Sequence, residues 1–129
     1  MHIRTTLTIT TTALAVGATV ALGGVASAGA EPSANAAAKP VRKTVKVGDN
    51  FYSPRKLTVP RNSTIKWAWL SDNSETHDVY LSKGPGGVKR FHSEPAATDY
   101  SYAKKLTRKG TYSVICTFHE NMKQKITVR

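Results

Sequence analysis

Apolar and polar residues alternate with a period of two along most of the chain after residue 40. Such alternation places successive side chains on opposite faces of a strand, and no stretch shows the 3.6-residue stripe of an amphipathic helix. The pattern therefore predicts short β-strands, each with one buried face. The alternating apolar positions are Val45 and Val47, Leu57 and Val59, Ile65, Trp67 and Trp69, and Ile126 and Val128.

Turn-forming residues recur between these apolar stretches. Short strands separated so often by turns are typical of an antiparallel β-sandwich or barrel. The segment from Ser82 to Thr98 is long, irregular and rich in Gly and Pro at its start, so we expect a surface loop there, with one helical turn at most. The turn signals lie at Asp49-Asn50, Ser53-Pro54, Pro60 to Asn62, Asp72-Asn73, Gly84 to Gly87 and Lys109-Gly110.

The first 28 residues have the features of a secretory signal peptide. A basic residue, Arg4, precedes an apolar and threonine-rich run over 5–25, and residues 26–28 read Ala-Ser-Ala, a cleavage pattern of small residues. An uncleaved membrane anchor is the alternative, but no basic cluster follows the run. We predict a signal peptide over 1–28, a flexible leader over 29–40 and one domain over 41–129. The protein is then exported to the periplasm, cell envelope or extracellular space, with no transmembrane anchor after processing.

The chain is strongly basic, with 19 Lys and Arg against 8 Asp and Glu. Loss of Arg4 with the signal peptide leaves 18 against 8, a net charge of +10. Such a charge favours acidic partners. The lysines are spread along the strands rather than clustered with aromatic residues, so we expect no nucleic acid. An acidic redox protein or an anionic cell-envelope surface is the expected partner, and we expect the protein to be a monomer.

The cysteine content points to a metal rather than to a disulfide. The single cysteine, Cys116, leaves no partner for a bridge, although small exported domains often depend on several. Cys116, His119 and Met122 fall within seven residues, and Met122 is the one methionine that remains once Met1 is removed. Thiolate, imidazole and thioether together are the donors that soft copper prefers. The motif therefore predicts a site for one copper ion.

A second imidazole is expected from a distant part of the chain. Cys116 follows Tyr112 and Val114 at intervals of two, so its side chain points to the same inward face as theirs. The segment over 76–81 is expected to be a strand with His77 on its inward face, while residues 117–121 form a tight turn. His77 thereby joins the candidate ligands Cys116, His119 and Met122.

The sequence around these residues resembles the cupredoxins, and within them the amicyanin, plastocyanin and pseudoazurin group. The resemblance rests on His77-Asp78-Val79 and on Gly-x-Tyr at residues 110–112 followed by Cys-x2-His-x2-Met at residues 116–122. It implies an all-β, Greek-key β-sandwich with a type 1 copper site. His77, Cys116 and His119 would form the trigonal ligand set, and Met122 would be the weak axial ligand.

Two residues depart from the pattern of that group. Asp78 stands where the group usually has asparagine, and a carboxylate can accept backbone hydrogen bonds but cannot donate any. The hydrogen bonds by which this residue connects the ligand loops are therefore expected to be altered. Phe118 stands where the amicyanin-like loop usually has proline, so its backbone N–H is available to the Cys116 sulfur, a contact that tunes the reduction potential.

Three functions remain open on this basis. An electron carrier fits a copper ion with three equatorial ligands and one axial ligand, because no position is open for a substrate. Copper storage or delivery would be expected to use more methionine. A metal-free sandwich that binds the envelope would leave the clustering of Cys116, His119 and Met122 unexplained. We expect no enzyme activity, because only His92 remains to build a second copper centre.

Several other residues are interpreted as structural. His92 lies in the irregular segment and is expected at the surface without a specific partner. Trp67 and Trp69 are expected in the core. The basic stretch Lys104-Lys105 and Arg108-Lys109 is interpreted as a solvated strand face, with a docking patch as the alternative.

Overall fold

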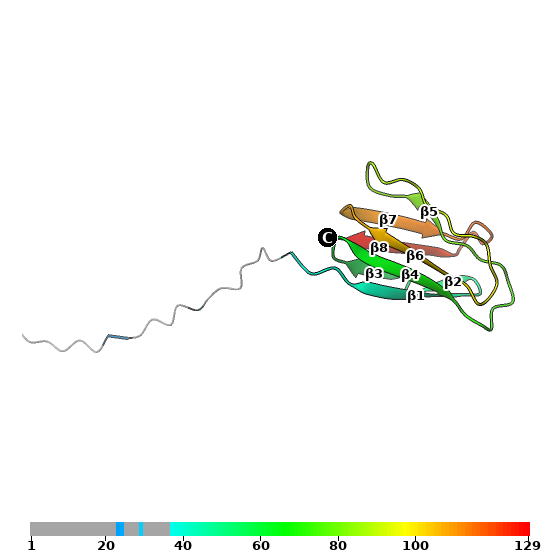
Figure 1. The fold of residues 1–129 in the computed structure, drawn as a ribbon, viewed down its shortest axis with the longest axis horizontal. Coiled ribbons are helices and arrows are strands. Elements are labelled where there is room, and N and C mark those ends of the chain that lie inside the picture. The colour runs from blue at the N-terminus through cyan, green and yellow to red at the C-terminus, as the bar shows by residue number, and fades with distance from the viewer. Residues whose placement is uncertain (1–22, 25–28, 30–36) are drawn as a thin grey trace, which may run out of the picture. The chain divides into compact units, whose positions relative to one another are not determined.

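The computed structural model describes residues 23–24, 29 and 37–129 (Figure 1). Nearly all of the predicted signal peptide and most of the predicted leader lie outside these residues. Within the described part of the chain, no helix is long and apolar enough to cross a membrane.

The domain consists of two four-stranded β-sheets, and the described residues contain no helix. One sheet has the order β2-β1-β4-β6 and the other the order β3-β8-β7-β5. The all-β sandwich is therefore confirmed. The strands are β1 (Arg42–Gly48), β2 (Phe51–Ser53), β3 (Lys56–Val59), β4 (Ser63–Trp69), β5 (Tyr80–Lys83), β6 (Ser101–Leu106), β7 (Gly110–Ile115) and β8 (Lys123–Val128).

The expectation of an antiparallel sandwich or barrel holds for four of the six strand pairs and is wrong at the other two. Strand β1 runs parallel to β4, and β3 runs parallel to β8. In both pairs the chain leaves one strand and crosses to another part of the molecule before the partner strand begins. Alternation along each strand predicts which faces are buried, but it contains no information about the direction of the neighbouring strand.

The apolar faces of the two sheets form one core, and the tryptophans lie in it as expected. Strand β4 alternates between buried and more accessible positions throughout its length. Trp67 is fully buried, and its Nε1–H donates a 2.9 Å hydrogen bond to Oε1 of Gln124 on β8, which connects the two sheets. Fully burying a large apolar side chain stabilises a fold by about 1.5–3 kcal/mol.

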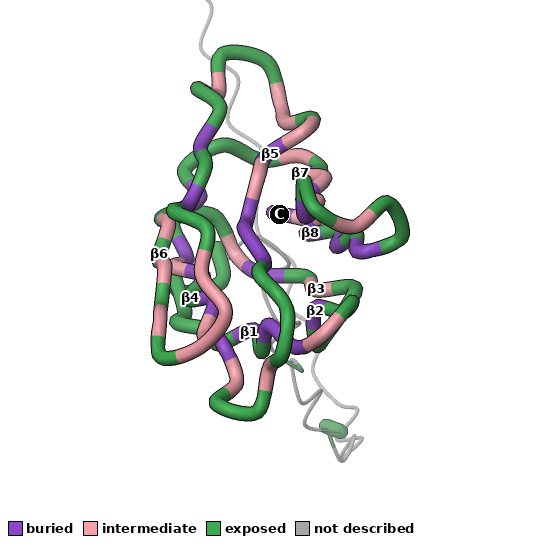
Figure 2. The backbone as a smooth tube through the Cα atoms, turned by 90° about the vertical axis from the view of Figure 1, so that its right-hand side faces the viewer, coloured by how far each residue is buried: buried purple, intermediate pink, exposed green. Residues whose placement is uncertain are grey.

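The strand directions bring several loops together at one end of the sandwich. Strands β1, β4 and β7 end there, and β5 and β8 begin there, because Ile115 at the end of β7 pairs with both Tyr80 and Lys123. The loops over 49–50, 70–79 and 116–122 therefore meet at this end, which faces the viewer in Figure 2. We call it the loop end.

The strand expected over 76–81 begins later than predicted. Strand β5 starts at Tyr80, and the backbone of His77 instead pairs with Ala96 through two hydrogen bonds of 2.9 and 3.0 Å. Ala96 belongs to the irregular segment over 82–98, which contains no helical turn and is held against His77 and Tyr80 by isolated bridges. His77 is thus fixed by a returning loop rather than by a sheet neighbour.

Candidate metal centre

Three potential metal ligands from two separate loops converge at the loop end. The Cys116 Sγ atom lies 3.6 Å from Nδ1 of His119 and 4.0 Å from Nδ1 of His77. All three donor atoms lie within 4.8 Å of one another. The structure therefore brings together three of the four residues expected from the sequence, with donor atoms facing a common point.

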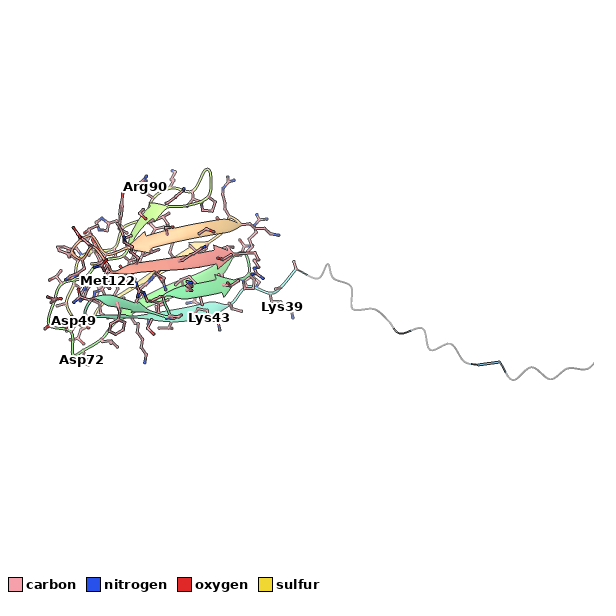
Figure 3. All side chains as sticks on the ribbon, turned by 180° about the vertical axis from the view of Figure 1, so that it is seen from behind. Lys39, Lys43, Asp49, Asp72, Arg90 and Met122 are labelled. Atoms are coloured by element: carbon pink, nitrogen blue, oxygen red, sulfur yellow. The ribbon has the colours of Figure 1, made fainter. Side chains whose placement is uncertain are left out.

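Backbone hydrogen bonds close the loop that carries Cys116, His119 and Met122. The Cys116 N–H donates to the Met122 carbonyl at 3.0 Å, and the Met122 N–H donates to the His119 carbonyl at 3.1 Å. Met122 is therefore adjacent to the start of the loop and is fully buried. Figure 3 shows it at the same end of the sandwich as Asp49 and Asp72.

Each histidine has a carboxylate beside its outer nitrogen, and the Asp49 carboxylate is hydrogen-bonded to His77. Nε2 of His77 lies 2.9 Å from Oδ1 of Asp49, and Nε2 of His119 lies 3.1 Å from Oε2 of Glu75. A histidine that binds metal typically donates its other ring N–H to such a partner, which fixes the tautomer and the ring plane. Both rings therefore turn Nδ1 toward the Cys116 sulfur.

The two carboxylates are themselves held by the loops around them. Asp49 accepts hydrogen bonds from the backbone and hydroxyl of Ser74, and Glu75 accepts one from Nδ2 of Asn50 at 3.0 Å. The hydrogen bond with His77, followed by those from Ser74, keeps the pKa of Asp49 far below its ordinary value. Asp49 is therefore ionised beside His77 at neutral pH. Neither carboxylate was expected from the sequence, because only the folded loops bring them to the histidines.

Burial differs sharply among the candidate ligands. His77 is fully buried and Cys116 is nearly so, whereas the His119 side chain is 21% exposed. Phe118, beside it in the loop, is 53% exposed. Burial raises the pKa of the Cys116 thiol, so a metal that binds the thiolate must displace a proton.

Asp78 ties the loop of His77 to the loop of Cys116 by accepting hydrogen bonds only. Its buried carboxylate accepts the Thr117 backbone N–H at 2.7 Å and also the Thr117 hydroxyl. Burial alone would raise the pKa of Asp78, but the hydrogen bonds from Thr117 and His92 outweigh burial and lower it. The two ligand loops are thus connected by hydrogen bonds as expected, and the carboxylate acts only as the acceptor.

His92 has a specific partner, contrary to the expectation from sequence. Its ring is 49% exposed, but Nε2 lies 2.6 Å from Oδ2 of Asp78. The surface position was correctly predicted, but the contact with Asp78 was not foreseen. No sequence signal links residues 78 and 92, because the contact depends on how the irregular segment folds back onto β5.

Comparison with known proteins identifies copper-binding relatives, in agreement with the candidate metal centre. The sequence model of the family described as copper binding proteins, plastocyanin/azurin family, matches residues 40–129. Amicyanin-alpha from Methylorubrum extorquens is 28% identical over 84 residues, which cover 65% of this chain and 69% of that protein.

Two solved structures show the similarity at the level of the fold. A reduced amicyanin variant superposes with a TM-score of 0.58 at 26% identity, covering 67% of this chain and 80% of that one. A copper-containing nitrite reductase from Thermus scotoductus superposes with the same TM-score and identity. That similarity covers 70% of this chain but only 22% of the reductase.

Proposed function

This chain belongs to the plastocyanin/azurin family of copper-binding proteins, and we propose that it carries single electrons through one copper ion held by His77, Cys116, His119 and Met122. Copper cycles between Cu(I) and Cu(II) when bound to such a ligand set. The residues of this chain fix the ligands, exclude water and provide the surface through which a partner exchanges the electron.

The observation that carries the proposal is the convergence of three donor atoms whose orientation is already fixed. The Cys116 sulfur and the two Nδ1 atoms face one point, and the outer nitrogen of each imidazole is engaged by Asp49 or Glu75. Two imidazoles and a thiolate with a buried methionine nearby are the donors of a type 1 copper site. A donor set that is already oriented changes little between oxidation states, which favours rapid electron exchange over ligand exchange.

Electron exchange would take place at the His119 edge of the site. His119 is the one candidate ligand with an appreciably exposed side chain, and Phe118 adds an exposed apolar ring next to it. A partner that contacts this small apolar surface would come within electron-transfer distance of the metal. The geometry needs no bound substrate, and we therefore propose a carrier rather than an enzyme.

Acidic and basic residues are unevenly distributed over the domain. This distribution affects where a charged redox partner can dock. Five of the seven acidic residues of the described part of the chain lie in the loops of the loop end, and the other two lie in the segment between β5 and β6: they are Asp49, Asp72, Glu75, Asp78 and Glu120, and Glu94 and Asp99. Arg42, Arg61 and Lys109 lie at the opposite end, where the β3–β4 and β6–β7 turns are found. Figure 3 shows Asp49 and Asp72 at one end and Lys39 at the other.

We propose that long-range attraction and close docking involve different parts of this surface. The net positive charge attracts an acidic redox partner at a distance. Arg55 and Lys123 are exposed next to the ligand loop, and Arg55 contacts the Asn121 carbonyl at 3.4 Å, so they are the cations best placed for docking. The basic stretch over 104–109 ends at the far end of the sandwich, which argues against the docking-patch interpretation.

The opposite end suits an anionic cell-envelope surface. A groove of about 780 Å³ at this end is lined by Lys39, Arg61, Lys109 and Arg129 among other residues. Contact through this groove would leave the candidate metal centre facing away from the surface. This arrangement agrees with an exported, monomeric carrier.

The test is to load the purified domain with Cu(II) and follow its visible spectrum. We expect an intense blue thiolate-to-copper absorption band. Ascorbate should bleach this band, and a reduced redox partner should bleach it rapidly in a stopped-flow experiment. Cys116→Ser should lose the band, while the wild type and an Asp72→Asn control should keep it. A colourless copper-loaded wild type would refute the proposal. Rapid loss of the whole ion to a mild chelator would favour copper delivery instead.

A further inference from the structure

Asp78 places a buried negative charge beside the candidate copper centre. The residue is 1% exposed and directly follows His77 in the chain. A buried charge is costly unless hydrogen bonds compensate it. Thr117 supplies two donors, its backbone N–H and its hydroxyl, and Nε2–H of His92 supplies another.

His92 is held rigidly where it meets Asp78. On both sides of it the backbone is bonded to the segment that carries Asp78: Leu81 N–H donates to the Phe91 carbonyl at 3.0 Å, and Ser93 N–H donates to the Val79 carbonyl at 3.0 Å. The Ser93 hydroxyl also accepts the Val79 N–H. The rings of His92 and Tyr80 pack in a T-shaped arrangement, with centroids 5.2 Å apart. His92 is therefore not a freely rotating surface side chain.

The hydrogen-bond direction follows from the chemistry of the two groups. An ionised carboxylate can only accept, so the imidazole must donate Nε2–H to Oδ2 of Asp78. The carboxylate in turn holds Thr117, the residue next to Cys116. A continuous chain of contacts thus runs from a half-exposed imidazole to the loop that supplies the thiolate.

We propose that His92 is a positioning residue of the copper centre, acting through Asp78 to fix Thr117 and the Cys116 end of the ligand loop. This inference rests on the copper site of the proposed function. His92 is not one of the candidate ligands, and its Nε2 contacts Asp78. It supplies the donor that a buried carboxylate needs.

The effect on the metal has a definite direction. Without the His92 donor, the negative charge of Asp78 is less compensated. The nearby negative charge then favours Cu(II) over Cu(I). The reduction potential should therefore fall when His92 is replaced by a residue that cannot donate, and the blue band should shift as the Cys116 loop relaxes.

A double-mutant cycle on the copper-loaded protein tests this inference. Voltammetry and visible spectra would be recorded for wild type, His92→Ala, Asp78→Asn and the double variant. We expect His92→Ala to lower the potential and shift the band when Asp78 is present, and to change neither when it is added to Asp78→Asn. His92→Gln, which retains an N–H donor, should restore most of both properties.

The matched control is Arg90→Ala. Arg90 lies two residues away on the same segment, but its guanidinium donates to the Tyr80 hydroxyl rather than to Asp78. It should leave the potential and the band unchanged apart from a small effect of lost charge. Equal shifts from His92→Ala in both backgrounds, or a shift from Arg90→Ala as large as that of His92→Ala, would overturn the proposal.

Two outcomes separate this inference from the proposed function. A wild type without a blue band refutes the copper site itself. If the wild type is blue and the His92→Ala substitution changes neither the spectrum nor the reduction potential, only the positioning role is refuted. If His92→Ala does not fold, as judged by circular dichroism, His92→Leu fills the volume without a donor and serves in its place.

Discussion

The Asp49 carboxylate lies 2.9 Å from Nε2 of the fully buried His77 ring, on the side of the imidazole opposite the Cys116 sulfur. Asp49 belongs to the β1–β2 turn and His77 to the loop between β4 and β5, so the contact joins two loops whose residues are 28 positions apart in the sequence. The carboxylate selects the tautomer that leaves the Nδ1 lone pair available for a metal. The ligand geometry at His77 therefore depends on a residue that does not bind the metal.

Replacing Asp49 by alanine should weaken copper binding by about 10–100-fold, the typical cost of losing such a partner of a metal-bound histidine. Competition with a Cu(I) chelator would measure the dissociation constant. Asp49→Asn should lose less, because its carbonyl oxygen still accepts the N–H. Asp72→Ala, an exposed acidic residue of the loop end, is the matched control. Equal affinities for Asp49→Ala and this control would contradict the role of Asp49.

Met122→Leu should leave copper bound but raise its reduction potential. A weak axial thioether stabilises Cu(II) more than Cu(I), so its loss disfavours the oxidised state. Leucine has a similar volume, and such a swap in a core usually costs less than about 1.5 kcal/mol. Voltammetry gives the potential, and thermal unfolding of the metal-free variant gives the packing cost. An unchanged potential would mean that Met122 serves only in packing.

The fold was largely predictable because alternation of apolar residues is a local property. Strands β1, β3, β4 and β8 lie where the alternating positions Val45, Leu57, Trp67 and Ile126 indicated them. The parallel pairings and the late start of β5 were not predictable. Both depend on which segments become neighbours after the chain crosses between the sheets, and single-strand periodicity contains no such information.

The residues of the candidate site also fall into those that could be predicted from the sequence and those that could not. Cys116, His119 and Met122 are recognisable because one short loop carries three rare donor residues. Asp49, Glu75 and His92 are common surface residue types, and they become informative only once their loops meet. Asp78 lies between these cases: its departure from the family pattern is visible in the sequence, but its donors are not.

Removing copper should lower the thermal stability of the domain. A ligand present at a thousandfold above its dissociation constant stabilises the native state by about 4 kcal/mol. For a domain of roughly 90 residues, that corresponds to a rise of about 16–32 °C in Tm. Calorimetry of the apo and copper-loaded forms measures the difference. Cys116→Ser, with its thiolate ligand removed, should show a much smaller rise. Identical apo and copper-loaded melting temperatures for the wild type would contradict a site formed in advance.

The last prediction concerns the cations that a redox partner meets. Arg55 and Lys123 flank the ligand loop, whereas Arg108 and Lys109 lie in or next to the β6–β7 turn at the other end. Attraction between exposed charges is screened over about 8 Å at physiological ionic strength. Only cations near the docking surface should therefore strongly affect the rate at which an acidic partner docks and transfers its electron.

Stopped-flow reduction of the Cu(II) protein by an acidic redox partner, measured across a salt series, distinguishes the two groups. The wild-type rate should fall as salt rises, because screening removes the attraction. Arg55→Gln with Lys123→Gln should flatten this dependence. The matched variant Arg108→Gln with Lys109→Gln removes the same charge from the far end and should alter the slope much less. That second variant should instead weaken binding to vesicles that contain anionic lipid, if the far-end groove faces the envelope. Equal flattening by both pairs would mean that net charge alone guides the encounter. A rate that ignores salt in every variant would rule out electrostatic steering.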